Sequence, residues 1–263
     1  MSISNKILIL FSICATTVLW SQPNPMVTIK RGTYVPLYGT KDKKPAAVES
    51  FKIDVYPITN AQYVAFLKKN PAYKRSKMIG LYADKSYLSH WVSDFDYGTD
   101  NKKDAPVTNI SWFAAKKYCE CQGKRLPTMD EWEYVAMADE KRLDARSKES
   151  FNNYILSWYE KPKTYQNPIG HTFKNYWGVY DMHGLVWEWT SDFNSLFLSG
   201  ESRKDKDTDT KLFCGSGSIN ATDLMNYAAF MRYAFRGSLK AKYTTRNLGF
   251  RCAQDLENKK TEK

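Results

Sequence analysis

Cysteine is the residue type in this sequence best suited to redox chemistry or to holding a soft metal ion. The five cysteines are Cys14, Cys119, Cys121, Cys214 and Cys252. Cys14 follows the bulky Ile13, where a lipid-attachment signal needs a small residue. A zinc site is disfavoured, because one residue separates Cys119 from Cys121 and zinc ligands are normally spaced by roughly two to four. In an oxidising compartment, the four cysteines after Cys14 permit one or two disulfides.

The N-terminus predicts export. Lys6 precedes an almost uninterrupted apolar run over residues 7–20, and Ser21 then offers a small residue for cleavage. This is the layout of a secretory signal peptide, and the run is short for a membrane-spanning helix. We therefore predict a signal peptide over residues 1–21, with a retained anchor as the alternative. The mature protein is expected to be secreted or periplasmic and to have no membrane span.

The composition predicts one aromatic-rich domain with a solvated basic surface. The formal net charge is +11, but basic and acidic residues are mixed, as in residues 203–211 and 257–263. An anionic partner is the alternative explanation of the charge, whereas no nucleic-acid partner is expected, since no motif for one is present. The residues left after signal cleavage suit a single domain. With 8 Trp and 18 Tyr, they predict a loop-rich α+β fold.

The elements that would position the cysteines are clearest in the centre of the sequence. Ser111 is expected to cap a helix that runs to Gln122, and Gly123 to end it in a left-handed conformation. Thr128 and Glu131 have the spacing of a capping box, which predicts a second helix directly after the first.

The other elements follow from apolar periodicity and from turn residues. Strands are expected over residues 27–32, 50–56 and 185–190, a helix over 59–69, irregular structure over 70–105 and 144–167, and glycine-containing turns over 176–184 and 214–218.

Five motifs in this order carry a family resemblance: Tyr56–Tyr63, Pro106–Trp112, Ala115–Tyr134, Gly178–Thr190 and Arg246–Cys252. Together they resemble the formylglycine-generating-enzyme, or sulfatase-modifying-factor, family. The resemblance covers residues 26–254 and implies an α+β fold of the C-type-lectin-like kind with extensive irregular structure. Residues 255–263 are expected to be a disordered tail.

The resemblance also implies how the cysteines are used. Cys119 and Cys252 match the positions of a family disulfide. Cys121 lies two positions from Cys119 and should point to a different face of its helix, so it cannot easily share that bond. Cys121 and Cys214 are therefore a candidate second thiol pair, as a disulfide, a redox couple or separate thiols.

The catalytic cysteines of the family have no counterpart. Active members are understood to oxidise a sulfatase cysteine to formylglycine with oxygen, using two thiolates that hold copper(I). One count along the sequence places the matching positions at Ala221 and Asn226, and another places them at Asp223 and Ala228. Residues 215–251 contain no cysteine. No catalytic residue is assigned, and copper is not expected.

Other metal ions have little support. Glu188 matches a family calcium ligand, but Leu185 stands where an asparagine is expected three residues earlier, so calcium remains only a possible cofactor. Some branches of the wider superfamily hold iron with histidines. Here His90, His171 and His183 have no ligand spacing, and His183 is expected to form local hydrogen bonds.

The framework of the family's peptide cleft is retained. The candidate cleft residues are Trp189, Ser218, Arg232 and Arg236. Trp187 also matches the cleft but is expected to pack in the core, and the two arginines could equally pair with buried carboxylates.

The sequence is consistent with three hypotheses about function. The leading hypothesis is an exported accessory or maturation factor that binds a protein or peptide without copper oxidase chemistry. The second is an oxidoreductase that modifies a protein side chain through a different site. The third is a structural component of the cell envelope.

Overall fold

The computed structural model describes residues 24–36, 44–194 and 224–256. These residues form short strands and helices joined by long irregular segments, which is an α+β fold. The strands are β1 (Met26–Ile29), β2 (Gly32–Tyr34), β3 (Ala46–Val48), β4 (Phe51–Asp54), β5 (Trp187–Glu188), β6 (Leu248–Gly249) and β7 (Ala253–Asp255). The helices are α1 (Asn60–Lys69), α2 (Trp112–Cys121), α3 (Met129–Ala136), α4 (Glu149–Tyr159) and α7 (Leu224–Ser238), with short 3₁₀ helices at Pro71–Tyr73, Arg75–Lys77 and Thr164–Gln166.

The largest sheet brings the first strand of the domain, β1, and the last, β7, together on either side of β4. Its antiparallel order is β1-β4-β7, while β2 pairs with β3 and β5 runs parallel to β6. Asp255 lies opposite Phe51 as the last residue of β7. The disordered tail predicted from residue 255 therefore starts too early, because this residue still pairs with β4. Residues 257–263 of that tail lie outside the described residues.

The helix ends predicted from capping residues are confirmed. The Ser111 side chain accepts a hydrogen bond from the backbone N–H of Ala114 at the start of α2. Thr128 and Glu131 form both bonds of a capping box at α3. Gly123 has a φ of +67°, the left-handed conformation expected after α2. In each case a local side chain or a glycine satisfies the geometry that a helix end requires.

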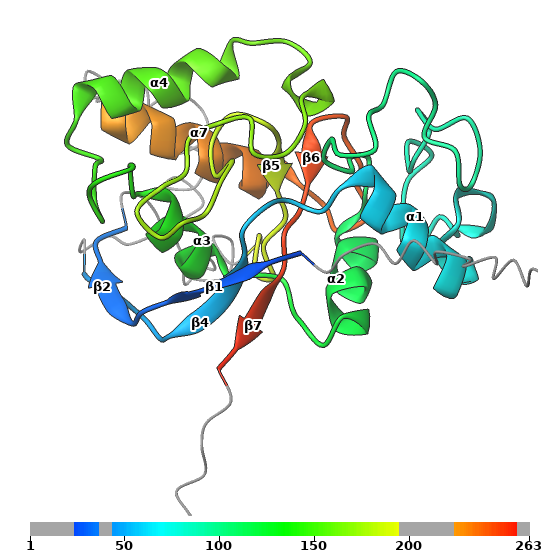
Figure 1. Ribbon diagram of the computed structural model, residues 1–263, viewed down its shortest axis with the longest axis horizontal. Helices are drawn as coiled ribbons and strands as arrows, with labels where there is room; N and C mark the ends of the chain where they lie inside the picture. Colours follow the sequence, from blue (N-terminus) through cyan, green and yellow to red (C-terminus); the bar gives the residue numbers. More distant parts are fainter. Residues whose placement is uncertain (1–23, 37–43, 195–223, 257–263) are drawn as a thin grey trace, which may run out of the picture.

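Two helices contradict the sequence analysis. Helix α4 occupies part of residues 144–167, which were expected to be irregular, and α7 was not predicted. The N-cap of α4, Lys148, makes no capping bond through its side chain. The two helices lie side by side (Figure 1), and Phe151 and Ile155 of α4 share a buried cluster with Ala228 of α7. Packing of one helix on the other, rather than local signals, stabilises the pair.

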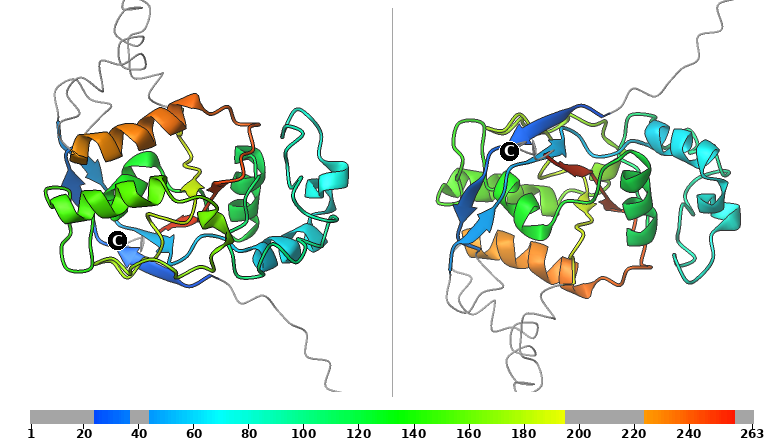
Figure 2. Two further views of the ribbon diagram at one scale, coloured as in Figure 1. Left: turned by 90° about the horizontal axis from the view of Figure 1, so that it is seen from above. Right: turned by 90° about the horizontal axis from the view of Figure 1, so that it is seen from below.

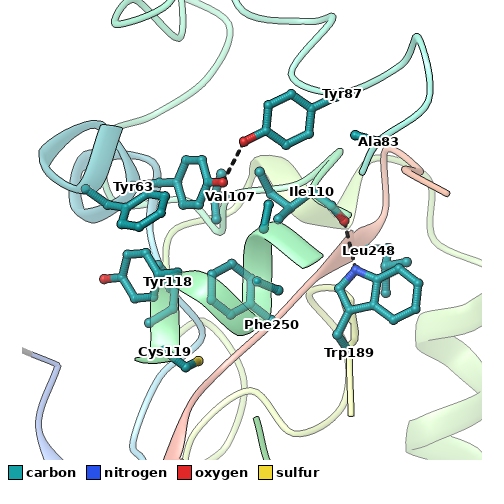
Figure 3. Packing of buried hydrophobic residues seen from close by; sticks show 14 of the residues in the cluster. Tyr63, Ala83, Tyr87, Val107, Ile110, Tyr118, Cys119, Trp189, Leu248 and Phe250 are labelled. Carbon is teal, nitrogen blue, oxygen red and sulfur yellow. Dashed lines mark hydrogen bonds between the residues drawn. The ribbon is translucent and has the colours of Figure 1, made fainter. Parts of the chain in front are cut away.

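The main core lies between α1, α2 and the C-terminal strands. Tyr63, Tyr118 and Phe250 pack ring against ring, and Tyr63 shares a 2.7 Å hydrogen bond with Tyr87 (Figure 3). The disulfide between Cys119 and Cys252 lies in the same cluster, with the two Cα atoms 5.6 Å apart. This disulfide confirms the pairing that the family resemblance implied.

The two ends of the molecule differ in character. Helix α1 and the mostly irregular segment 70–105 form one end, and α4 with α7 forms the other (Figures 1 and 2). Tyr87 and Trp91 are buried and fasten the irregular segment to the core. Within the described parts of the protein, every helix is too short or too polar to span a bilayer.

Candidate functional site

A cavity of about 370 Å³ opens between the C-terminal end of α4, the segment leading into β5, and α7. The segment 161–165, Trp132 of α3, Arg246 and Asn247 also line it. Pockets of this size accept a small molecule or a short piece of peptide. The cavity therefore lies at the end of the molecule formed by the two helices that the sequence did not predict.

One wall of the cavity is a stack of three aromatic rings. The ring of Trp187 lies between those of Tyr159 and Phe235, with centroid distances of 4.9 and 4.6 Å. The three side chains come from β5, α4 and α7 respectively. Trp187 was expected to pack in the core; it does pack against the main core cluster, but it also lines the cavity.

Gly184 allows a second aromatic side chain to approach this wall. Its φ is +114°, and a Cβ atom here would lie 2.7 Å from ring carbons of Trp158. Any larger residue would be strained in its backbone and would displace the indole. The glycine-containing turn predicted over residues 176–184 thus ends at a residue that shapes the cavity.

The inner side of the cavity contains a buried ion cluster. Glu133 accepts hydrogen bonds from Arg232 Nη2 at 2.8 Å and from Arg236 Nη1 at 2.6 Å. Burial alone would raise the pKa of the Glu133 carboxyl, but the two guanidinium groups outweigh it and lower that pKa to about 2. Arg236 also lies 4.7 Å from the ring centroid of Trp132. Both arginines line the cavity, and both pair with a buried carboxylate, which was one of the two alternatives expected from the sequence.

A second buried ion pair occupies Glu188. Arg251 donates from Nε and Nη2 to the two Glu188 oxygens at 2.8 and 2.9 Å, and Trp132 Nε1 adds a bond of 2.8 Å. A calcium ion needs roughly six to eight oxygen ligands. No group of three or more His, Cys, Asp or Glu side chains that could hold a metal lies among residues 24–36, 44–194 and 224–256. The arrangement around Glu188 does not fit calcium, because an arginine already takes the place of the cation.

His183 contributes a neutral imidazole to the cavity lining. Its Nε2 donates to the Ala136 carbonyl oxygen at 2.8 Å, which is the local hydrogen bond expected from the sequence. Burial, with the positive charge of Arg232 as the next cause, lowers the pKa of His183 to about 3. His183 is therefore uncharged at neutral pH.

Trp189 does not reach the cavity. It is fully buried in the main core, and its indole Nε1 donates to the Ile110 carbonyl oxygen at 2.8 Å (Figure 3). The prediction that Trp189 lines a cleft is wrong, because its ring is enclosed in the main core cluster, whereas Trp187 is only partly buried beside that cluster.

Comparison with known proteins decides the family. The Sulfatase-modifying factor enzyme 1-like domain, also described as FGE-sulfatase, matches residues 17–256. The chain belongs to this family. It is 27% identical over 290 residues to the "Formylglycine-generating enzyme" of Bos taurus, covering 89% of this chain and 76% of that protein.

Another relative of this sulfatase-modifying-factor family member is described as inactive. The protein is 27% identical over 248 residues to the "Inactive C-alpha-formylglycine-generating enzyme 2" of Bos taurus, covering 80% of this chain and 79% of that protein. Among solved structures, it resembles PvdO from Pseudomonas aeruginosa at 18% identity and a TM-score of 0.49, over 88% of this chain and 94% of that one.

The positions predicted to match the family's copper cysteines can be placed only in part. Ala228 lies in α7 and is buried against α4. Asn226 belongs to the same helix. Three other predicted site residues, Cys214, Ser218 and Asp223, lie outside the described residues, as does Ala221. Cys121 is exposed and is not disulfide-bonded among the described cysteines, and its Sγ lies 3.6 Å from Asn70 Oδ1.

Sequence reasoning missed several residues of the cavity. Trp158 and Tyr159 come from the unpredicted helix α4, and Lys161 and Lys163 follow it directly. Arg246 begins the last family motif but was given no role. The available signal for these residues was the aromatic pair at 158–159 followed by two lysines. This pair would indicate a site only if the segment were already recognised as the end of a helix.

Proposed function

We propose that this family member is an exported accessory or maturation factor that binds a protein or peptide in the cavity and performs no copper-dependent oxidation. The observation that carries the proposal is a formed cavity in a chain that lacks the two thiolates expected from the family. No cysteine occurs anywhere in residues 215–251, where the family resemblance places two thiolates. Copper(I) is held in proteins by such soft ligands.

The nature of the cavity supports binding. Stacked aromatic rings give a rigid apolar wall that loses little side-chain entropy when a ligand packs on it. The buried clusters around Glu133 and Glu188 hold the surrounding side chains in place. No cysteine is among the described residues that line the cavity, so thiol chemistry there has no support.

Selection from a random peptide library on the mature protein tests this function. The matched variant is Asn247→Trp, because Asn247 is exposed at the cavity lining and an indole there would block entry. We expect peptides selected by the wild-type protein to lose at least tenfold in affinity for the variant, the effect of about 1.4 kcal/mol.

An exposed asparagine elsewhere provides the control. Asn153 lies on the solvent side of α4, and Asn153→Trp should leave the affinity of the selected peptides unchanged. Selection of no peptide, or of peptides that bind the Asn247 variant as well as the wild type, would refute binding in the cavity.

A further inference from the structure

Arg246 is held in the cavity lining by neutral partners. Its Nη1 donates to Thr108 Oγ1 at 2.8 Å and its Nη2 to Asn101 Oδ1 at 2.6 Å. Its guanidinium lies 4.3 Å from the ring centroid of Tyr165. Thr108 and Asn101 are buried, so they fix the guanidinium plane without neutralising its charge. An arginine has five N–H donors, and only two of them are used in these bonds.

Among the described residues, the charges around the cavity leave Arg246 without a counter-ion. Glu188 is neutralised by Arg251, and Glu133 accepts bonds from two arginines, so the inner wall has no spare negative charge. In the described part of the protein, no carboxylate forms an ion pair with Arg246, and burial lowers its pKa. A half-buried cation without a counter-ion is a site prepared for an anion.

Two lysines add to this positive charge at the cavity. Lys161 and Lys163 both line it, and Lys161 Nζ lies 4.0 Å from the ring centroid of Trp158. Three aromatic side chains also lie in this part of the lining: Trp158, Tyr159 and Tyr165. The cavity thus combines flat apolar walls with a fixed guanidinium and two flexible ammonium groups, which suits a ring next to an acidic group.

From this geometry we propose that the cavity recognises a peptide segment that places an aromatic side chain between these walls and a carboxylate against Arg246. This inference rests on the proposed peptide-binding function and specifies its ligand. The carboxylate could be the C-terminus of a polypeptide or an aspartate next to the aromatic residue, and the two sources offer the same chemistry to the guanidinium.

Matched ligand pairs that differ only in charge test the proposal. N-acetyl-L-tryptophan and its amide represent the C-terminal source, and acetyl-Trp-Asp-amide and acetyl-Trp-Asn-amide represent the internal one. NMR titration of the ¹⁵N-labelled mature protein should show at least one acidic ligand binding roughly tenfold more tightly than its neutral partner, as expected for charge-assisted hydrogen bonds. The pair that shows this preference identifies the source.

Arg246→Met should reduce that ratio to about one. The control is Arg142→Met, because Arg142 is exposed and does not line the cavity; it should retain the full ratio. If Arg246→Met does not fold, Arg246→Lys decides instead, since it keeps the charge but loses the planar fork, and its ratio should fall. Equal binding of acidic and neutral ligands by the wild type, or an unchanged ratio in the Arg246 variant, would overturn the inference.

The two proposals fail in different ways. Library peptides that lose affinity in the Asn247→Trp variant, but show no preference for aromatic and acidic residues, would remove only this inference. Absence of any selected peptide would remove the proposed function itself.

Discussion

Replacing Glu133 with Gln should lower the free energy of unfolding by about 3–5 kcal/mol. The substitution keeps the size of the side chain but leaves Arg232 and Arg236 buried without a negative partner. The measurement is urea denaturation at neutral pH, followed by circular dichroism. Glu120→Gln is the matched control: Glu120 lies on the surface of α2 with lysines at 3.8 and 3.9 Å, and such exposed pairs contribute at most about 1 kcal/mol.

The contribution of Glu133 to the free energy of unfolding should also depend on pH. Its folded-state pKa of about 2 lies below the ordinary value of 4.5, so its contribution is present above pH 4.5 and is lost as the pH falls toward 2. The difference corresponds to about 3 kcal/mol. The stability gap between wild type and Glu133→Gln should therefore shrink over this window. A gap that is absent at pH 7, or that does not change below pH 4.5, would contradict this role of Glu133.

Removing the disulfide should have an effect of similar size. Replacing Cys119 and Cys252 together with Ala opens a loop of 133 residues, and the chain-entropy relation gives a loss of about 5 kcal/mol for a loop of that length. Alanine avoids placing two unpaired hydroxyl groups in the core. The loss should appear as a lower urea midpoint under non-reducing conditions.

The remaining described cysteine provides the control for the disulfide. Cys121 is exposed on the same helix as Cys119, and Cys121→Ala should change stability by no more than about 0.5 kcal/mol. Equal losses in the Cys121 variant and in the double variant would show that the bond between Cys119 and Cys252 does not stabilise the domain.

The parts of the fold that could be predicted are those with local signals. Thr59, Ser111 and Thr128 each cap a helix with their own side chain, so a stretch of four residues is enough to locate each helix start. The Cys119–Cys252 disulfide joins residues far apart in the sequence, and only the resemblance to a family could identify that pair.

Helices α4 and α7 show why the rest could not be predicted. Helix α4 has no cap from the side chain of Lys148, and its sequence includes two asparagines together with Ile155 and several aromatic residues, which are not strong helix formers. Its stability comes from contact with α7, about 70 residues later in the sequence. Because the cavity lies at these two helices, most of the candidate site was hidden from the sequence.

The tryptophans at β5 show that the sequence also could not predict which side chain of a pair is buried. Residues 187 and 189 would share one face of a regular strand, yet Trp187 lines the cavity and Trp189 is in the core. Both rings contact the same core cluster, and the backbone N–H of Trp189 still donates to the Gly249 carbonyl oxygen, so the alternation continues at this residue. Alternation places both rings on one side of the strand, but it does not tell which of them lies deeper.

The most direct test of the account is an assay for aldehyde on a cysteine-containing sulfatase peptide. The purified protein is incubated with copper(I), the peptide and oxygen, and the product is measured by mass spectrometry. We predict no formylglycine above the level of a protein-free control, because the protein has no cysteine in residues 215–251. Repeated turnover to formylglycine, lost in Cys214→Ser, would contradict this account.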